Sequence, residues 1–134
     1  MPEIENEREA FLAIIYACMS ADNHVSDLEL KEMTYILSKK KLYTDINILE
    51  IYTKVQSTYQ FIGYNSFKLI EMSAMHISPH LKLTIYAHAM EIFLADKNFH
   101  ANERQLASYL KKVLEIDENQ AAKIQEVINI KSMG

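Results

Sequence analysis

Residues that break helices are scarce in this chain, because its 134 residues include only two glycines and two prolines. So few breakers exclude a many-turned β sandwich and favour long helices joined by short loops. Cysteine is scarcer still. Cys18 stands alone, which excludes an intramolecular disulfide, and nothing in the sequence points to secretion. Its place in an apolar run predicts a small buried side chain rather than a reactive thiol.

Strong net charge and long apolar segments are missing too. The formal net charge of −4 supplies no general attraction to nucleic acid or to an anionic membrane. The longest apolar run, residues 11–21, is too short to span a bilayer, and the acidic stretch before it lacks the positive flank of a signal peptide. We therefore expect a cytoplasmic protein with no transmembrane segment and no nucleic-acid partner.

The residues that are present predict a single all-α domain over residues 1–134. Apolar residues make up 49% and charged residues 24% of the chain, which is typical of a globular protein. Apolar side chains recur at helical spacing almost throughout, which predicts a bundle of about seven helices and no strand. We expect the helices at about 6–20, 26–41, 44–59, 65–77, 78–95, 100–114 and 117–130.

Local signals mark three of these helix starts. Ser26 and Glu29 have the spacing of a capping box, in which the hydroxyl accepts from the Glu29 amide and the carboxylate accepts from the Ser26 amide. Ser78 before Pro79 places a capping residue ahead of a proline at the first helical position. Asp117, followed three residues later by Gln120, predicts the start of the last helix.

Two related loops, residues 21–29 and 95–103, both read Ala-Asp-x-x-apolar-x-x-x-Glu, and Asp96 follows Asp22 by 74 residues. Each loop follows an apolar helix and precedes an amphipathic one. We therefore predict two half-repeats, roughly residues 6–60 and 79–130, related by a pseudo-two-fold axis.

Such a pairing would bring four carboxylates to one side of the domain: Asp22, Glu29, Asp96 and Glu103. Oxygen ligands alone favour Mg, Ca or Mn over zinc, so these four residues are candidate ligands of a divalent cation. A calcium EF-hand is excluded, because its first and third ligand positions would fall on Cys18 and Ser20. A purely structural interpretation stays open, since helix capping accounts for Glu29 and loop hydrogen bonds account for the two aspartates.

These loops, together with the helix start at residues 116–121, resemble the TerB-like family, named for the tellurite-resistance protein TerB. The family usually has glycine after Ala-Asp, where this chain has Asn23 and Lys97. The resemblance implies an all-helical, pseudo-symmetric bundle. It also implies a cation-linked or protein-binding role in stress response, without established enzyme chemistry. The residues that match the family's acidic positions are Asp22, Glu29, Asp96 and Glu103.

Histidines supply weaker candidates for a metal site. His76 and His80 have helical spacing, but the Ser78-Pro79 pair between them interrupts the helix and argues against a zinc pair. His88 and Glu91 lie three residues apart on one predicted helix, yet the second Glu-His pair that a metal site in a bundle needs is missing. His24 and His100 lie in or beside the two loops.

Several aromatic residues gather in the middle of the chain: Tyr52, Tyr59, Phe61, Tyr64 and Phe67. Core packing between the two halves is the first interpretation, and a groove for a partner or a ligand pocket is the alternative. The sequence has no Gly-rich phosphate loop, no H-E-x-x-H, no nucleophile elbow and no C-x-x-C.

Three functional hypotheses follow. The first is a non-enzymatic TerB-like interaction module tuned by a divalent cation. The second is an adaptor that binds a partner protein through an apolar or aromatic surface, with purely structural carboxylates. The third, a metal-dependent hydrolase, requires an open cleft that holds two or more of the named carboxylates.

Overall fold

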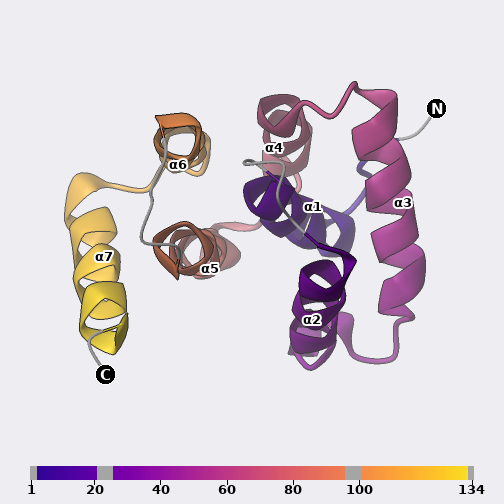
Figure 1. The fold of residues 1–134 in the computed structure, drawn as a ribbon, viewed down its shortest axis with the longest axis horizontal. Coiled ribbons are helices and arrows are strands. Elements are labelled where there is room, and N and C mark those ends of the chain that lie inside the picture. Colours follow the sequence, from indigo (N-terminus) through magenta and orange to yellow (C-terminus); the bar gives the residue numbers. More distant parts are fainter. Residues whose placement is uncertain (1–2, 21–25, 96–100, 133–134) are drawn as a thin grey trace.

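The computed structural model describes residues 3–20, 26–95 and 101–132, and these residues form seven α-helices and no strand (Figure 1). The predicted all-α class is therefore confirmed. The helices are α1 (Glu7–Met19), α2 (Asp27–Ser38), α3 (Ile48–Phe61), α4 (Ser66–Ala74), α5 (Pro79–Ala95), α6 (Ala101–Val113) and α7 (Glu118–Ser132). One turn of 3-10 helix, η2 (Lys41–Tyr43), lies between α2 and α3. None of the described helices is long and apolar enough to cross a membrane.

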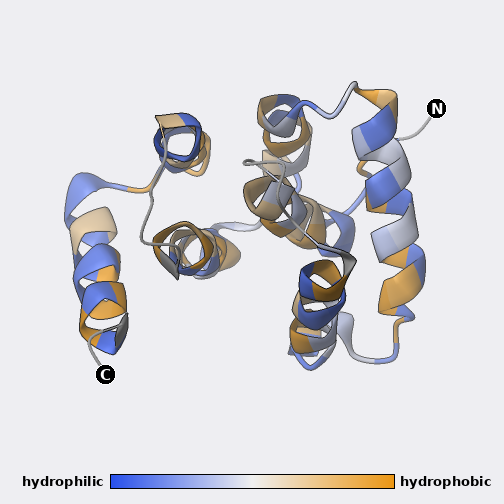
Figure 2. Ribbon diagram, in the orientation of Figure 1, coloured by the Kyte–Doolittle hydropathy of each residue, from blue (hydrophilic) through white to orange (hydrophobic). Residues whose placement is uncertain are grey.

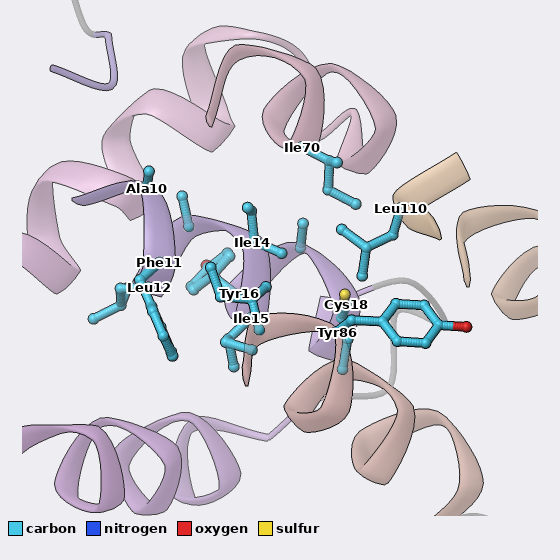
Figure 3. Packing of buried hydrophobic residues seen from close by; sticks show 14 of the residues in the cluster. Ala10, Phe11, Leu12, Ile14, Ile15, Tyr16, Cys18, Ile70, Tyr86 and Leu110 are labelled. Carbon is cyan, nitrogen blue, oxygen red and sulfur yellow. The ribbon is translucent and has the colours of Figure 1, made fainter. Parts of the chain in front are cut away.

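Helix α1 forms the centre of the core. Every residue from Ala10 to Cys18 is buried, because this segment is apolar on all faces, as is usual for a helix covered on every side. Glu9 before it is also buried and pairs with Lys54 at 3.0 Å. The helix packs against α2, α3, α4 and α5. Figure 3 shows its side chains leaving the helix on several sides, with Ile70 of α4 and Leu110 of α6 beyond one of them. The predicted burial of Cys18 is confirmed.

Helix α5 connects this core to the C-terminal helices. It packs against α1, α6 and α7, and α4 also contacts α6. Figure 1 shows α7 at one edge of the molecule and α3 at the opposite edge, with α1 and α5 between them. Figure 2 shows mainly hydrophobic colours along α1 and α5, whereas α2 and α7 carry blue and orange residues in alternation.

The predicted helix starts hold at all three signals, each within one residue. The capping box of Ser26 and Glu29 is present in full at the start of α2. The Asp117 carboxylate accepts a hydrogen bond from the Gln120 amide at 2.8 Å, at the start of α7. Helix α5 begins at Pro79 as expected, but the Ser78 hydroxyl donates to the Glu7 carboxylate of α1.

The expected start of the third helix, at residue 44 or 45, is wrong by about three residues. Helix α3 begins at Ile48, with the Asn47 side chain accepting from the Leu49 amide. Two features delay the start. Asp45 has a left-handed φ of 63°, which interrupts a right-handed helix, and the buried Tyr43 hydroxyl donates to the Arg8 carbonyl at 2.6 Å. This anchor holds η2 against α1.

Candidate functional site

Glu29, a predicted cation ligand, serves as the cap of its own helix. One of its carboxylate oxygens accepts from the Ser26 hydroxyl at 3.2 Å and from the Ser26 amide at 3.4 Å. In return the Glu29 amide donates to the Ser26 hydroxyl at 3.1 Å. These three hydrogen bonds explain the position of the Glu29 carboxylate without a bound cation.

Glu103 occupies the same place in α6 that Glu29 occupies in α2, the third residue of the helix, but its surroundings differ. Glu103 is only 5% exposed, whereas Glu29 is on the surface. The two glutamates belong to helices that lie apart in Figure 1. Asp22 and Asp96 lie outside the described residues, so the site of four carboxylates stays a prediction. Within the described ranges, no three His, Cys, Asp or Glu side chains are grouped to hold a metal.

Ser78, His80 and Glu7 form the described cluster that most resembles a catalytic triad. Glu7 accepts from both the amide and the hydroxyl of Ser78, at 2.6 and 2.5 Å, and the Ser78 hydroxyl also lies 3.1 Å from His80 Nδ1. In a triad the carboxylate orients the histidine, which then accepts the proton of the serine. Here the carboxylate binds the serine directly, so the cluster joins the start of α5 to α1.

His88 is half-buried on α5, with its ring edge-on to Phe11 of α1 at 6.1 Å between centroids. Burial lowers the pKa of His88, and Lys40 lowers it further, against an opposing effect of Glu91. Glu91 itself pairs with Lys131 of α7 at 2.7 Å. His88 and Glu91 line the same groove, as their spacing on one helix predicts.

The central aromatic residues pack α3 against α1. The rings of Tyr52 and Tyr59 lie edge-on to Tyr16 of α1, at 5.9 and 5.4 Å, and Tyr64 continues the series beyond Tyr59. This set therefore lies within the first predicted half rather than between the halves. Phe67, another of the aromatic residues in the middle of the chain, contacts Tyr109 of α6 in the second predicted half. Their ring centroids lie 5.4 Å apart.

Helix α2 exposes large apolar side chains on its outer face. Leu28, Tyr35 and Ile36 are 65%, 62% and 60% exposed, although all three belong to one helix of 12 residues. The opposite face of α2 is ordinary, because Leu30, Met33 and Leu37 are buried. Single exposed apolar residues need no explanation, but three on one helix make this face a candidate interaction surface.

Two grooves run along the sides of this helix. The groove between α2 and α5 has a volume of about 480 Å3, and α1 supplies part of its wall. Its apolar lining includes Ile15, Met19, Met33, Ile36 and Ile92, and its charged lining is Glu29, Glu32 and Glu91. The groove between α2 and α3 has a volume of about 470 Å3 and is lined by residues that include Tyr35, Leu49 and Tyr52.

Charge is distributed unevenly along the outer face of α2. Glu32 lies one turn before Tyr35, and Lys39 lies one turn after it, with its ammonium group 4.5 Å from the centre of the Tyr35 ring. In the described part of the chain, neither Glu32 nor Lys39 forms an ion pair. The candidate site is therefore the outer face of α2, formed by Leu28, Glu32, Tyr35, Ile36 and Lys39, with a groove on each side.

Reasoning from sequence did not find this face. The pattern predicted an amphipathic helix after residue 26, but it did not predict that Ile36 would be 60% exposed. The available signal was an excess of apolar residues, because six apolar side chains between Leu28 and Leu37 exceed what one buried stripe requires. Comparisons of the chain with protein-family models, with curated proteins and with solved structures found no match.

Proposed function

We propose that the protein is a non-enzymatic, TerB-like helical module that binds a partner protein through the outer face of α2. The observation that carries the proposal is the exposure of Leu28, Tyr35 and Ile36 beside two grooves of about 480 and 470 Å3. A bound helix or loop would cover these side chains and place its own in the grooves. Apolar burial of this kind contributes about 25 cal/mol for each Å2 removed from water.

Placing a photo-crosslinker on the outer face of α2 in cells tests this proposal. We expect Ile36→p-benzoylphenylalanine to give adducts of discrete mass, and we expect a second change, Tyr35→Ser, to reduce them. The matched control carries the crosslinker at Val127, an exposed apolar position on α7 (56% exposed). Equal adducts at Val127, or adducts at Ile36 that Tyr35→Ser leaves unchanged, would contradict a binding surface on α2.

The cation-linked part of the TerB-like hypothesis rests on Asp22, Glu29, Asp96 and Glu103. Thermal melts with Mg, Ca or Mn, compared with melts in EDTA, test it directly, because a ligand of the folded state raises the melting temperature. A rise that disappears in Asp22→Ala and Asp96→Ala supports a cation at the loops. If the cations do not raise the melting temperature, or if both variants keep the rise, the cation-linked part is wrong. The partner-binding proposal is not affected by that result.

A further inference from the structure

The outer face of α2 is a regular stripe opposite the buried face. Leu28, Glu32, Tyr35 and Lys39 follow one another at spacings of four, three and four residues, which places them in one row along a helix. The contact between Lys39 and the Tyr35 ring shows that two members of the row are neighbours. The row is therefore a continuous strip of surface about three turns long.

The order of charges along this strip makes it complementary to itself. Glu32 precedes Tyr35 by three positions and Lys39 follows it by four, whereas Lys31 lies on the flank of the strip, in the groove toward α3. If a second α2 lies antiparallel on the first, with the two-fold axis near Tyr35, the order reverses. Glu32 of each chain then faces Lys39 of the other, and Tyr35 of each chain faces Ile36 of the other across the axis. Both ion pairs form at once, because a two-fold interface repeats every contact.

We propose that the partner of this surface is a second copy of the chain, bound through antiparallel α2 helices. The inference rests on the proposed function, since it names what covers the exposed face of α2. Charge complementarity selects this occupant, because neither Glu32 nor Lys39 has an ion partner within the described residues of its own chain. A parallel arrangement would place like charges together and would be repelled.

The size of the strip sets the expected strength. One pair of three-turn helices buries less than the ~1,600 Å2 of a standard protein interface. We therefore expect a weak dimer whose population depends on protein concentration. Ile36 lies next to Tyr35 and extends the apolar contact at the axis.

Sedimentation equilibrium on the full chain, over a range of concentrations, tests the inference with charge reversals. Glu32→Lys alone places lysines opposite one another, and Lys39→Glu alone places glutamates opposite one another. We expect each variant to raise the dissociation constant about tenfold or more. An equimolar mixture of the two variants restores both ion pairs, so it forms a heterodimer about as tight as the wild type. The double variant in one chain also regains the dimer.

The controls make the same charge changes on the exposed surface of α7, as Glu126→Lys and Lys123→Glu, and should leave the dissociation constant unchanged. Circular dichroism checks that each variant is folded. A wild-type chain that stays monomeric at all concentrations overturns the self-pairing, and adducts to a different protein at position 36 would then preserve the proposed function. The inference is also overturned if the charge reversals leave the dissociation constant unchanged. The same holds if the equimolar mixture of the two variants does not form a heterodimer. If the wild-type chain is monomeric and the crosslinker at position 36 gives no adducts, both the self-pairing and the proposed function are wrong.

Discussion

At the scale of single residues, Ser73 is a polar group in an apolar place. It is fully buried in α4, and its hydroxyl has no hydrogen-bond partner among the described residues. We expect Ser73→Ala to leave the free energy of unfolding unchanged or to raise it by up to about 1 kcal/mol, because it removes an unsatisfied polar atom. Urea unfolding measures the change.

Thr58 provides the matched control for this prediction. It is equally buried, but its hydroxyl donates to the Lys54 carbonyl at 2.9 Å. Thr58→Val should therefore lower the free energy of unfolding by about 1 kcal/mol. If Ser73→Ala destabilises the protein as much as Thr58→Val does, the Ser73 hydroxyl has a role that this account misses.

Glu115 has a left-handed φ of 58° just after the end of α6, a backbone conformation that is unfavourable for residues other than glycine. The amide of the next residue, Ile116, donates to the Lys111 carbonyl at 3.0 Å, which closes the helix end in the way that glycine usually permits. We expect Glu115→Gly to raise the free energy of unfolding by about 0.5–1 kcal/mol. Differential scanning calorimetry would detect the higher melting temperature, and a lower one would contradict the assignment.

At the scale of elements, Glu7 joins α1 to the start of α5. Partial burial raises the pKa of Glu7, but the two hydrogen bonds from Ser78 and the charge of His80 lower it by more, so the pKa lies below its usual value of 4.5. A lowered folded pKa means that the link is fully formed above pH 4.5 and is lost as pH falls through the folded value. The link therefore stabilises the protein at neutral pH and loses this contribution in acid.

We expect Glu7→Gln to lower the free energy of unfolding at pH 7 by about 1 kcal/mol, since hydrogen bonds to a charged group are the stronger ones. Toward pH 3 the wild-type carboxyl becomes increasingly protonated, so the difference between wild type and variant should shrink. Urea unfolding at both pH values measures it. The control is Glu126→Gln on the exposed surface of α7, and a Glu7→Gln effect of equal size at both pH values would refute the ionic link.

Long-range anchors are what the sequence alone predicts least well. The starts of α2 and α7 depend on side chains three residues apart, so the pattern of Ser26 and Glu29 was sufficient to predict the first. The start of α3 depends on a hydrogen bond between Tyr43 and Arg8, 35 residues apart, which no local pattern contains. The same limit applies to the candidate site, because whether Ile36 is covered depends on where α5 lies.

At the scale of the whole molecule, His88 lies where α1 and α5 meet, and charges on the neighbouring elements act on it. Burial lowers its pKa, Lys40 and Lys131 lower it further, and Glu91 raises it. The unfolded chain therefore binds the proton more readily, so stability is complete above pH 6.5 and decreases as pH falls below that value.

We expect the melting temperature to decrease between pH 7.5 and pH 5, and His88→Gln to make that decrease smaller. We compare the slopes of melting temperature against pH, because the substitution also changes the packing against Phe11 and shifts the melting temperature at every pH. His76→Gln is the control, since His76 lies in the connection between α4 and α5. Identical slopes for wild type and His88→Gln would show that His88 does not couple folding to pH.

The central position of α1 has a consequence for synthesis of the chain. This helix is synthesised before α5, which covers one of its sides and is complete only at Ala95. At a translation rate of about 5–20 residues per second, the apolar side chains of α1 stay partly exposed for roughly 4–15 s before α5 can pack against them. During that interval the nascent segment from Phe11 to Cys18 is a natural binding site for a chaperone, and slow translation before α5 would increase its aggregation.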